Sequence, residues 1–122
     1  MPYDPNNIFA RILRGEIPCN KIYEDEYALA FHDIAPQAPI HVLVIPKGEY
    51  ISFDDFSSSA PTKALAGFYR AAQKVTEILE LQPGGYRILA NTGADAHQEV
   101  PHYHLHIFAG CDLGWMIKRG LV

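Results

Sequence analysis

The sequence predicts an α+β domain with a mainly antiparallel sheet, and three observations lead to that fold class. Short apolar segments typical of strands occur in two groups, one before residue 47 and one after residue 85. A single long amphipathic segment with helical spacing lies between the two groups. The order of strands, helix and strands is typical of α+β architecture. We expect one domain over residues 1–122, with a C-terminal tail over about residues 110–122.

The first elements are a short helix and a β-hairpin. Asn6 or Asn7 can cap the helix, and Gly15 is its expected end. "KIYE" (21–24) and "YALAFHD" (27–33) are separated by acidic turn residues, so they are expected to pair as a hairpin. The apolar positions that recur at helical spacing before Gly15 are Ile8, Phe9, Ile12 and Leu13.

Two further strands are expected on either side of the long helix. The prolines of "IAPQAP" (34–39) interrupt regular structure before the first of them. That strand, "HVLVIP" (41–46), is a nearly continuous apolar run, which predicts burial on both faces. The second is "YRILAN" (86–91), and a polar loop follows it.

The long helix is predicted from its apolar stripe. The serines 57–59 are expected to cap it, Pro61 suits its first turn, and "PGG" (83–85) is expected to end it. The stripe recurs at 3.6-residue spacing and comprises Leu65, Phe68, Tyr69, Ala72, Val75 and Leu79.

Composition excludes several classes of protein. Apolar residues make up 48% of the chain, charged residues 20%, and the net charge of −4 gives no basic surface for nucleic acid. Cys19 and Cys111 lie far apart and predict no disulfide framework. The first residues lack the pattern of a signal peptide, and no apolar run is long enough to span a bilayer. We expect a cytoplasmic protein.

Three histidines alternate in "PHYHLHIF" (101–108). In an extended segment His102, His104 and His106 share one face of the strand. The alternate apolar set, which favours a strand and faces the other side, comprises Tyr103, Leu105 and Ile107.

Three interpretations of this alternation remain open on spacing alone. The histidines could be solvent-facing, which is improbable for three in perfect alternation. They could bind a metal, but three same-face positions span about 13 Å at roughly 3.3 Å per residue. One ion would therefore need a ligand from another strand, such as His41. Alternatively, one imidazole could attack phosphorus while its neighbours orient it or move protons.

The segment "QEVPHYHLHIF" (98–108) resembles the motif that names the histidine triad (HIT) family, in which histidines alternate with apolar residues. Further segments resemble the Hint branch of that family in the same order, and Trp115 matches its tryptophan after the triad. The resemblance covers nearly the whole chain except about residues 48–64. Those further segments are "NIFARILRGEIP", "ALAFHDIAPQAPIHVLVIPK" and "GYRILANTG".

This resemblance implies a HIT domain with a five-stranded sheet, which dimerises to form a ten-stranded sheet. It also implies a hydrolase for purine nucleoside 5′-phosphoramidates or related adenylates, yielding an AMP-like product. The middle histidine of the triad, His104, is implied to be the nucleophile that forms a nucleotidyl-histidine. His102 and His106 are implied to flank it, and His41 matches a fourth active-site histidine.

The resemblance assigns the nucleotide pocket as well. Asp33 matches the carboxylate that receives the ribose hydroxyls, which is chemically sensible for two hydroxyl donors. Asn91 matches an amide on the phosphate side. The base and sugar pocket is implied to comprise Ile8, Phe9, Phe31, His32 and Ile34, and the remaining substrate-binding residues are His97, Gln98, Glu99 and Trp115.

The chain departs from the family pattern just before the triad. Ala96 and His97 stand at usual glycine positions, where His97 is expected to narrow the site or add an imidazole. Glu99 stands where many relatives carry a serine near the leaving group. Its carboxylate is expected either to act as a proton relay or to repel a phosphate. Pro101 lacks an amide donor, which suggests an irregular strand start.

No metal or other cofactor is expected, because Asn7 and Ala10 stand where zinc-binding relatives carry Cys-x-x-Cys. Three alternative functions remain: a dinucleoside polyphosphate hydrolase, a nucleotide-binding scaffold with secondary catalysis, and a zinc enzyme built on the histidines.

Overall fold

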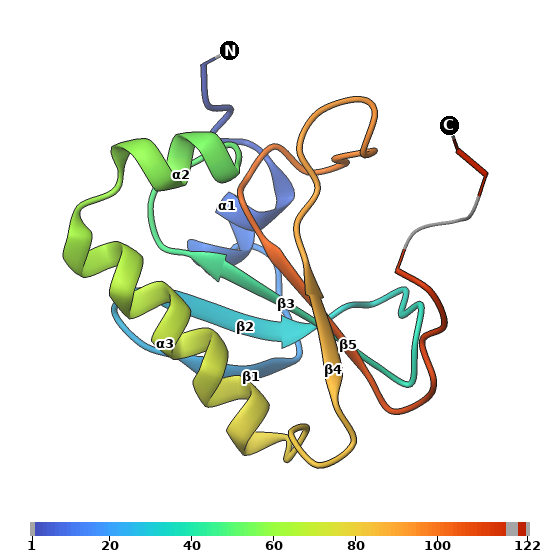
Figure 1. Cartoon of the computed structure of the whole chain (residues 1–122). Coiled ribbons are helices and arrows are strands. Elements are labelled where there is room, and N and C mark those ends of the chain that lie inside the picture. Colours follow the sequence, from blue (N-terminus) through green and yellow to red (C-terminus); the bar gives the residue numbers. More distant parts are fainter. Residues whose placement is uncertain (1, 117–119, 122) are drawn as a thin grey trace.

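The computed structural model describes residues 2–116, 120 and 121, and its centre is a five-stranded antiparallel sheet (Figure 1). The strand order is β1-β2-β3-β5-β4, and every neighbouring pair is antiparallel. The α+β fold class is therefore confirmed. The elements are α1 (Ile8–Leu13), β1 (Lys21–Glu24), β2 (Ala28–His32), β3 (Ile40–Pro46), α2 (Phe53–Ser59), α3 (Thr62–Ile78), β4 (Tyr86–Leu89) and β5 (Leu105–Ala109).

Helix α1 forms where its cap and its apolar spacing predict. Asn7 is the cap, because its side chain accepts a hydrogen bond of 2.9 Å from the Ala10 N–H. After the helix Gly15 takes a φ of 78°, a left-handed conformation that glycine adopts without strain. The buried face of α1 carries Phe9, which packs with Leu29, Phe31, Leu43 and Ile45.

The predicted hairpin forms from β1 and β2, and β3 lies in the middle of the sheet. One Asp25 carboxylate oxygen accepts hydrogen bonds from the Tyr27 and Ala28 amides, at 2.8 and 3.0 Å, and so fixes the turn. Strand β3 is buried from His41 to Pro46, as its continuous apolar run predicts.

Helix α3 lies across one face of the sheet (Figure 1). Phe68, Ala72 and Val75 of its predicted stripe are buried in the larger core, which also contains Tyr103, Leu105 and Ile107. Tyr69 is 43% exposed at the rim, where its hydroxyl lies 2.8 Å from that of Tyr103. The sheet therefore has α3 on one face and α1 on the other.

One helix, α2, was not predicted, and the predicted role of the serines was wrong. Ser57–Ser59 lie inside α2 rather than at the start of the long helix. Ser52 caps α2 by accepting from the Asp55 N–H at 3.3 Å. Pro61 stands at the N-cap of α3 without a side-chain cap. A proline fixes φ and lacks an N–H, so it can start a helix unaided.

The predicted limits of other elements also need correction, and β4 ends at Leu89, two residues before the end of the predicted segment. Helix α3 ends at Ile78, before the "PGG" segment, and Glu80 takes a φ of 55°. Strand β5 begins only at Leu105, so His102 and His104 precede the strand. Pro101 lies in an irregular segment four residues before β5 rather than at the strand start, so the sheet does not need the amide that it lacks. Among the described residues, no helix is both long and apolar enough to cross a membrane.

Candidate active site

A cavity of about 580 Å³ opens on the α1 face of the sheet. Its walls come from α1 and the segment after it, from the end of β2, from the loop before β5, and from the histidine segment. One part is mainly apolar and is lined by Ile8, Phe9, Ile12, Ile17, Pro18, Cys19, Phe31, Leu43 and Val100. The remaining lining residues are His32, Asp33, Ile34, Ala35, Gln37, Asn91, Ala96, His97, Glu99, His104 and His106.

His104 lies in this cavity with one ring nitrogen fixed by the backbone. Its Nδ1 is 2.7 Å from the carbonyl oxygen of His102. Because a carbonyl only accepts, Nδ1 carries the proton and Nε2 keeps its lone pair. Burial lowers the pKa of His104 below its usual value, although the carboxylates of Asp33 and Glu99 oppose this. The ring is therefore neutral at pH 7 and has a nucleophilic nitrogen available.

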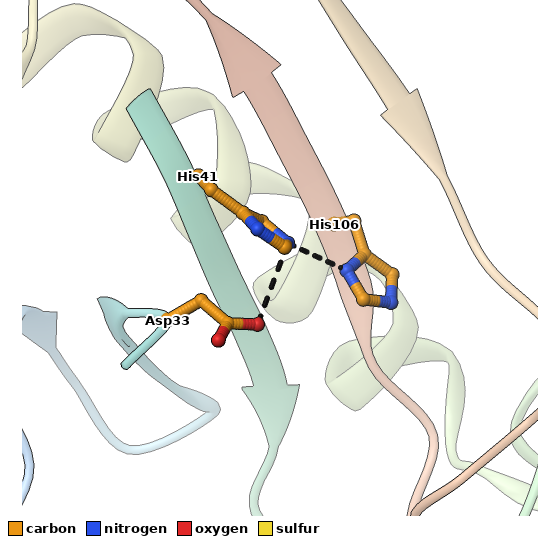
Figure 2. A group of neighbouring side chains, drawn as sticks. All are labelled: Asp33, His41 and His106. Atoms are coloured by element: carbon orange, nitrogen blue, oxygen red, sulfur yellow. Dashed lines mark hydrogen bonds and ion pairs between the residues drawn. The ribbon is translucent and has the colours of Figure 1, made fainter. Parts of the chain in front are cut away.

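His41, His106 and Asp33 form a second group beside it (Figure 2). The Gln37 N–H donates to His41 Nδ1 at 3.1 Å, so the proton of the neutral His41 ring is on Nε2. That nitrogen lies 2.9 Å from His106 Nδ1 and 3.5 Å from Asp33 Oδ2. His41 therefore donates to His106, and the remaining ring nitrogen of His106, Nε2, carries a proton.

Burial keeps this pair neutral. Burial, together with the neighbouring His104 and His41 rings, lowers the pKa of His106 to about 4. Burial also lowers the pKa of His41, against the effect of the Asp33 carboxylate. Both rings pack on Phe108, with the centroids of His41 and Phe108 4.2 Å apart.

His102 lies outside the cavity lining, although it was predicted to flank the nucleophile. Its side chain is completely buried, and its Nε2 lies 2.9 Å from the carbonyl oxygen of Pro46. Its Nδ1 lies 2.7 Å from the hydroxyl of Tyr3. Both ring nitrogens are therefore engaged within the protein, whereas the rings of His104 and His106 are neighbours at 4.9 Å.

The loop before the triad brings the sequence departures to the cavity. His97 takes a φ of 56°, the left-handed conformation that a glycine would adopt freely, and its side chain adds an imidazole to the lining. Glu99 also lines the cavity. Gln98 instead holds the loop in place, since its amide nitrogen donates to the Ile51 and Val100 carbonyls at 2.7 and 3.1 Å.

Comparison with known proteins gives the family of this chain. A family model described as the HIT domain matches residues 14–113. The chain belongs to the HIT family. It is a hydrolase of this family, and the predicted resemblance is confirmed at that level.

Three HIT relatives show how far the similarity extends. An uncharacterized HIT-like protein of Azospirillum brasilense is 61% identical over 97% of both chains. A purine nucleoside phosphoramidase of Escherichia coli is 39% identical, over 92% of this chain and 93% of the relative. A solved HIT family hydrolase from Clostridium thermocellum is 39% identical with a TM-score of 0.84, covering 93% of this chain and 97% of that chain.

Sequence reasoning missed several residues that shape this HIT site. Phe108 and Leu43 look like ordinary strand residues, and Gln37 lies in a proline-rich turn without an active-site signal. Tyr3 precedes every predicted element, so only the fold could place it beside His102.

Trp115, which was predicted to bind substrate, is 76% exposed and does not belong to the described cavity lining.

The group in Figure 2 contains three side chains of the kinds that bind metal ions. One donor atom from each of Asp33, His41 and His106 lies within 4.8 Å of the other two. Ligand atoms around a tetrahedral zinc ion with bonds of about 2.0 Å are about 3.3 Å apart. The two imidazole nitrogens are 2.9 Å apart, which is a hydrogen-bond distance. This spacing suits a shared proton better than a shared metal ion.

Proposed function

We propose that this HIT hydrolase cleaves purine nucleoside 5′-phosphoramidates or related adenylates through a nucleotidyl-His104 intermediate. One observation carries the proposal: the backbone carbonyl of His102 binds Nδ1 of His104, which leaves the Nε2 lone pair at the cavity. The Escherichia coli relative, a purine nucleoside phosphoramidase at 39% identity, supports the substrate class.

The proposed reaction is a double displacement. His104 Nε2 attacks the α-phosphorus, a P–N bond forms, and the bond from phosphorus to the leaving nitrogen breaks. The leaving amine takes a proton from solvent through the open cavity, while the His106 Nε2–H, whose tautomer His41 fixes, donates a hydrogen bond to a phosphoryl oxygen. Water then attacks phosphorus and releases one proton to solvent, and the bond to His104 breaks. The net products are a nucleoside monophosphate and an amine.

The rest of the cavity fits the nucleoside. Its volume of about 580 Å³ lies within the usual range for small-ligand sites. Phe9, Phe31 and Ile8 supply apolar surface for a base, with His32 and Ile34 at the rim toward the sugar. We assign the ribose hydroxyls to Asp33, whose Oδ1 is fixed by the Ala35 N–H at 2.8 Å and has further acceptor capacity.

The opposite end of the cavity is assigned to the phosphate and the leaving group. Asn91 and His97 contribute hydrogen-bonding groups there, and Glu99 contributes a negative charge. A polyphosphate leaving group would be repelled by the Glu99 carboxylate, whereas an amine would not. This favours a phosphoramidate over the alternative substrate, a dinucleoside polyphosphate.

We also propose that the protein is cytoplasmic and that its HIT domain spans residues 1–122. In this proposal two copies form a homodimer along β4, and Trp115 reaches the substrate only in the dimer. Strand β4 is an edge of the sheet and exposes Tyr86 and Ile88 at 40% and 46%. Light scattering tests the dimer, and a monomeric mass at assay concentration would contradict it.

The test of the proposed function compares the wild type with His104→Asn on adenosine 5′-phosphoramidate. Asparagine keeps a donor for the His102 carbonyl but has no nucleophilic nitrogen, so turnover is expected to disappear while AMP binding persists. Wild-type turnover in His104→Asn would contradict the proposal. A wild type that binds AMP without turnover would instead favour the scaffold function. Faster turnover of a diadenosine polyphosphate would favour the polyphosphate hydrolase.

A further inference from the structure

Tyr3 reaches the histidine triad from the segment that precedes α1. Its hydroxyl oxygen lies 2.7 Å from Nδ1 of His102, and the two rings meet edge to face with centroids 5.7 Å apart. Tyr3 is half-buried and His102 is completely buried. The contact therefore joins two residues almost a hundred positions apart beneath the proposed active site.

The direction of this hydrogen bond follows from the other nitrogen of His102. His102 Nε2 lies 2.9 Å from the Pro46 carbonyl oxygen, which can only accept, so Nε2 carries the proton. Nδ1 of the neutral ring is then an acceptor, and the Tyr3 hydroxyl donates to it. Burial raises the pKa of Tyr3 and lowers the pKa of His102 to about 4, so both partners stay neutral at pH 7.

The main chain connects His102 directly to the proposed nucleophile. The carbonyl oxygen of His102 accepts the hydrogen bond from His104 Nδ1 at 2.7 Å. The orientation of that carbonyl sets which tautomer His104 adopts and where its Nε2 lies. Two hydrogen bonds, from Tyr3 and to Pro46, hold the His102 ring at both nitrogens and so limit rotation of this residue.

We propose that Tyr3 is a positioning residue for His104, acting through the His102 ring and the His102 carbonyl. This inference rests on the proposed function, in which His104 Nε2 attacks phosphorus. Tyr3 lies outside the described cavity lining, so it acts on the rate of the chemical step and not on nucleotide binding. Loss of its hydroxyl leaves the buried Nδ1 of His102 without its donor, and the ring and its carbonyl then shift.

Tyr3 also makes a second contact, of the kind expected if its role were only to stabilise the fold. Its hydroxyl also interacts with the side chain of Asn7, the cap of α1. If Tyr3 served only to hold the terminal segment against α1, its removal would lower stability and leave the proton position on His104 unchanged. The experiment therefore reads both the rate and that proton position.

The experiment compares Tyr3→Phe with the control Tyr23→Phe on adenosine 5′-phosphoramidate. Tyr23 also donates its hydroxyl to a single side chain, Asp25 at 2.9 Å, but lies on the edge strand β1. We expect Tyr3→Phe to lower kcat about tenfold with KM within about twofold of the wild type, since small misplacements of a reacting group reduce rates strongly. Tyr23→Phe is expected to match the wild type. An unchanged kcat in Tyr3→Phe would overturn the proposal.

Nitrogen NMR of the histidine rings supplies a readout independent of turnover. The wild type is expected to show His102 protonated at Nε2 and His104 protonated at Nδ1, and Tyr3→Phe is expected to give a mixture at His104. A wild-type His102 protonated at Nδ1 would overturn the proposal even if Tyr3→Phe does not fold. If the wild type lacks turnover dependent on His104, the proposed function fails, while these spectra still decide whether Tyr3 positions the ring.

Discussion

Acid should unfold this protein more easily than its carboxylates alone would allow, because His102 is buried and neutral. Burial holds its pKa at about 4, against an ordinary value of 6.5. Below pH 6.5 the unfolded chain binds a proton that the folded chain does not. The contribution of the neutral, buried His102 to the free energy of unfolding is therefore fully present above pH 6.5 and is lost as pH falls toward 4. The difference between 6.5 and about 4, at about 1.4 kcal/mol per pH unit, corresponds to a loss of about 3 kcal/mol.

Urea unfolding followed by circular dichroism between pH 7 and 4.5 measures this loss. His106 shifts in the same direction, with its pKa lowered to about 4, and adds to the effect. Glu24 does not interfere, because Lys21 and Lys47 hold its pKa at about 2 and its contribution is lost only at lower pH. In His102→Gln the free energy of unfolding should change less steeply with pH, by the amount that corresponds to about one proton fewer bound on unfolding. A free energy of unfolding that stays constant from pH 7 to 4.5 would refute the reasoning.

Three further predictions concern packing, specificity and metals. A Cβ on Gly67 would lie 2.2 Å from the Tyr27 ring, so Gly67→Ala should destabilise the protein by about 1–2 kcal/mol in urea unfolding, despite the better helix propensity of alanine. Glu99→Gln removes a negative charge from the end of the cavity that we propose for the leaving group. The ratio of kcat/KM for a diadenosine polyphosphate to kcat/KM for the phosphoramidate should rise about fivefold, because removing the charge removes about 1 kcal/mol of repulsion between Glu99 and the polyphosphate. An unchanged ratio would remove Glu99 from specificity. Treatment with a chelator should leave turnover unchanged, because a proton joins His41 to His106. Loss of activity that zinc restores would contradict this.

The order of strands and the central helix follow from local patterns, because strand and helix periodicities differ clearly in this chain. The continuous apolar run of β3 correctly predicts a strand buried on both faces. Helix α2 has only seven residues and three of them are serines, so its composition resembles a cap more than a helix. Its formation depends on Phe56, which is completely buried against α3 and Tyr103.

Most of the residues that line the cavity are among those predicted from the sequence, but their arrangement is not, and the predicted His41, Gln98, His102 and Trp115 lie outside the described lining. Alternation in the sequence makes the three histidines look equivalent. The structure differentiates them through partners that are distant in the chain: Tyr3 and Pro46 for His102, and His41 for His106. No local spacing contains these contacts, since they depend on strand pairing and on the path of the N-terminal segment.

The stereochemical course at phosphorus tests the central role of His104 most directly. A substrate made chiral at the α-phosphorus, with sulfur and an oxygen isotope, reports whether one or two displacements occur. Attack by His104 followed by attack by water inverts the configuration twice, so the nucleoside monophosphate should show overall retention. Net inversion would mean that water attacks the substrate directly, and the nucleotidyl-His104 intermediate would then be contradicted.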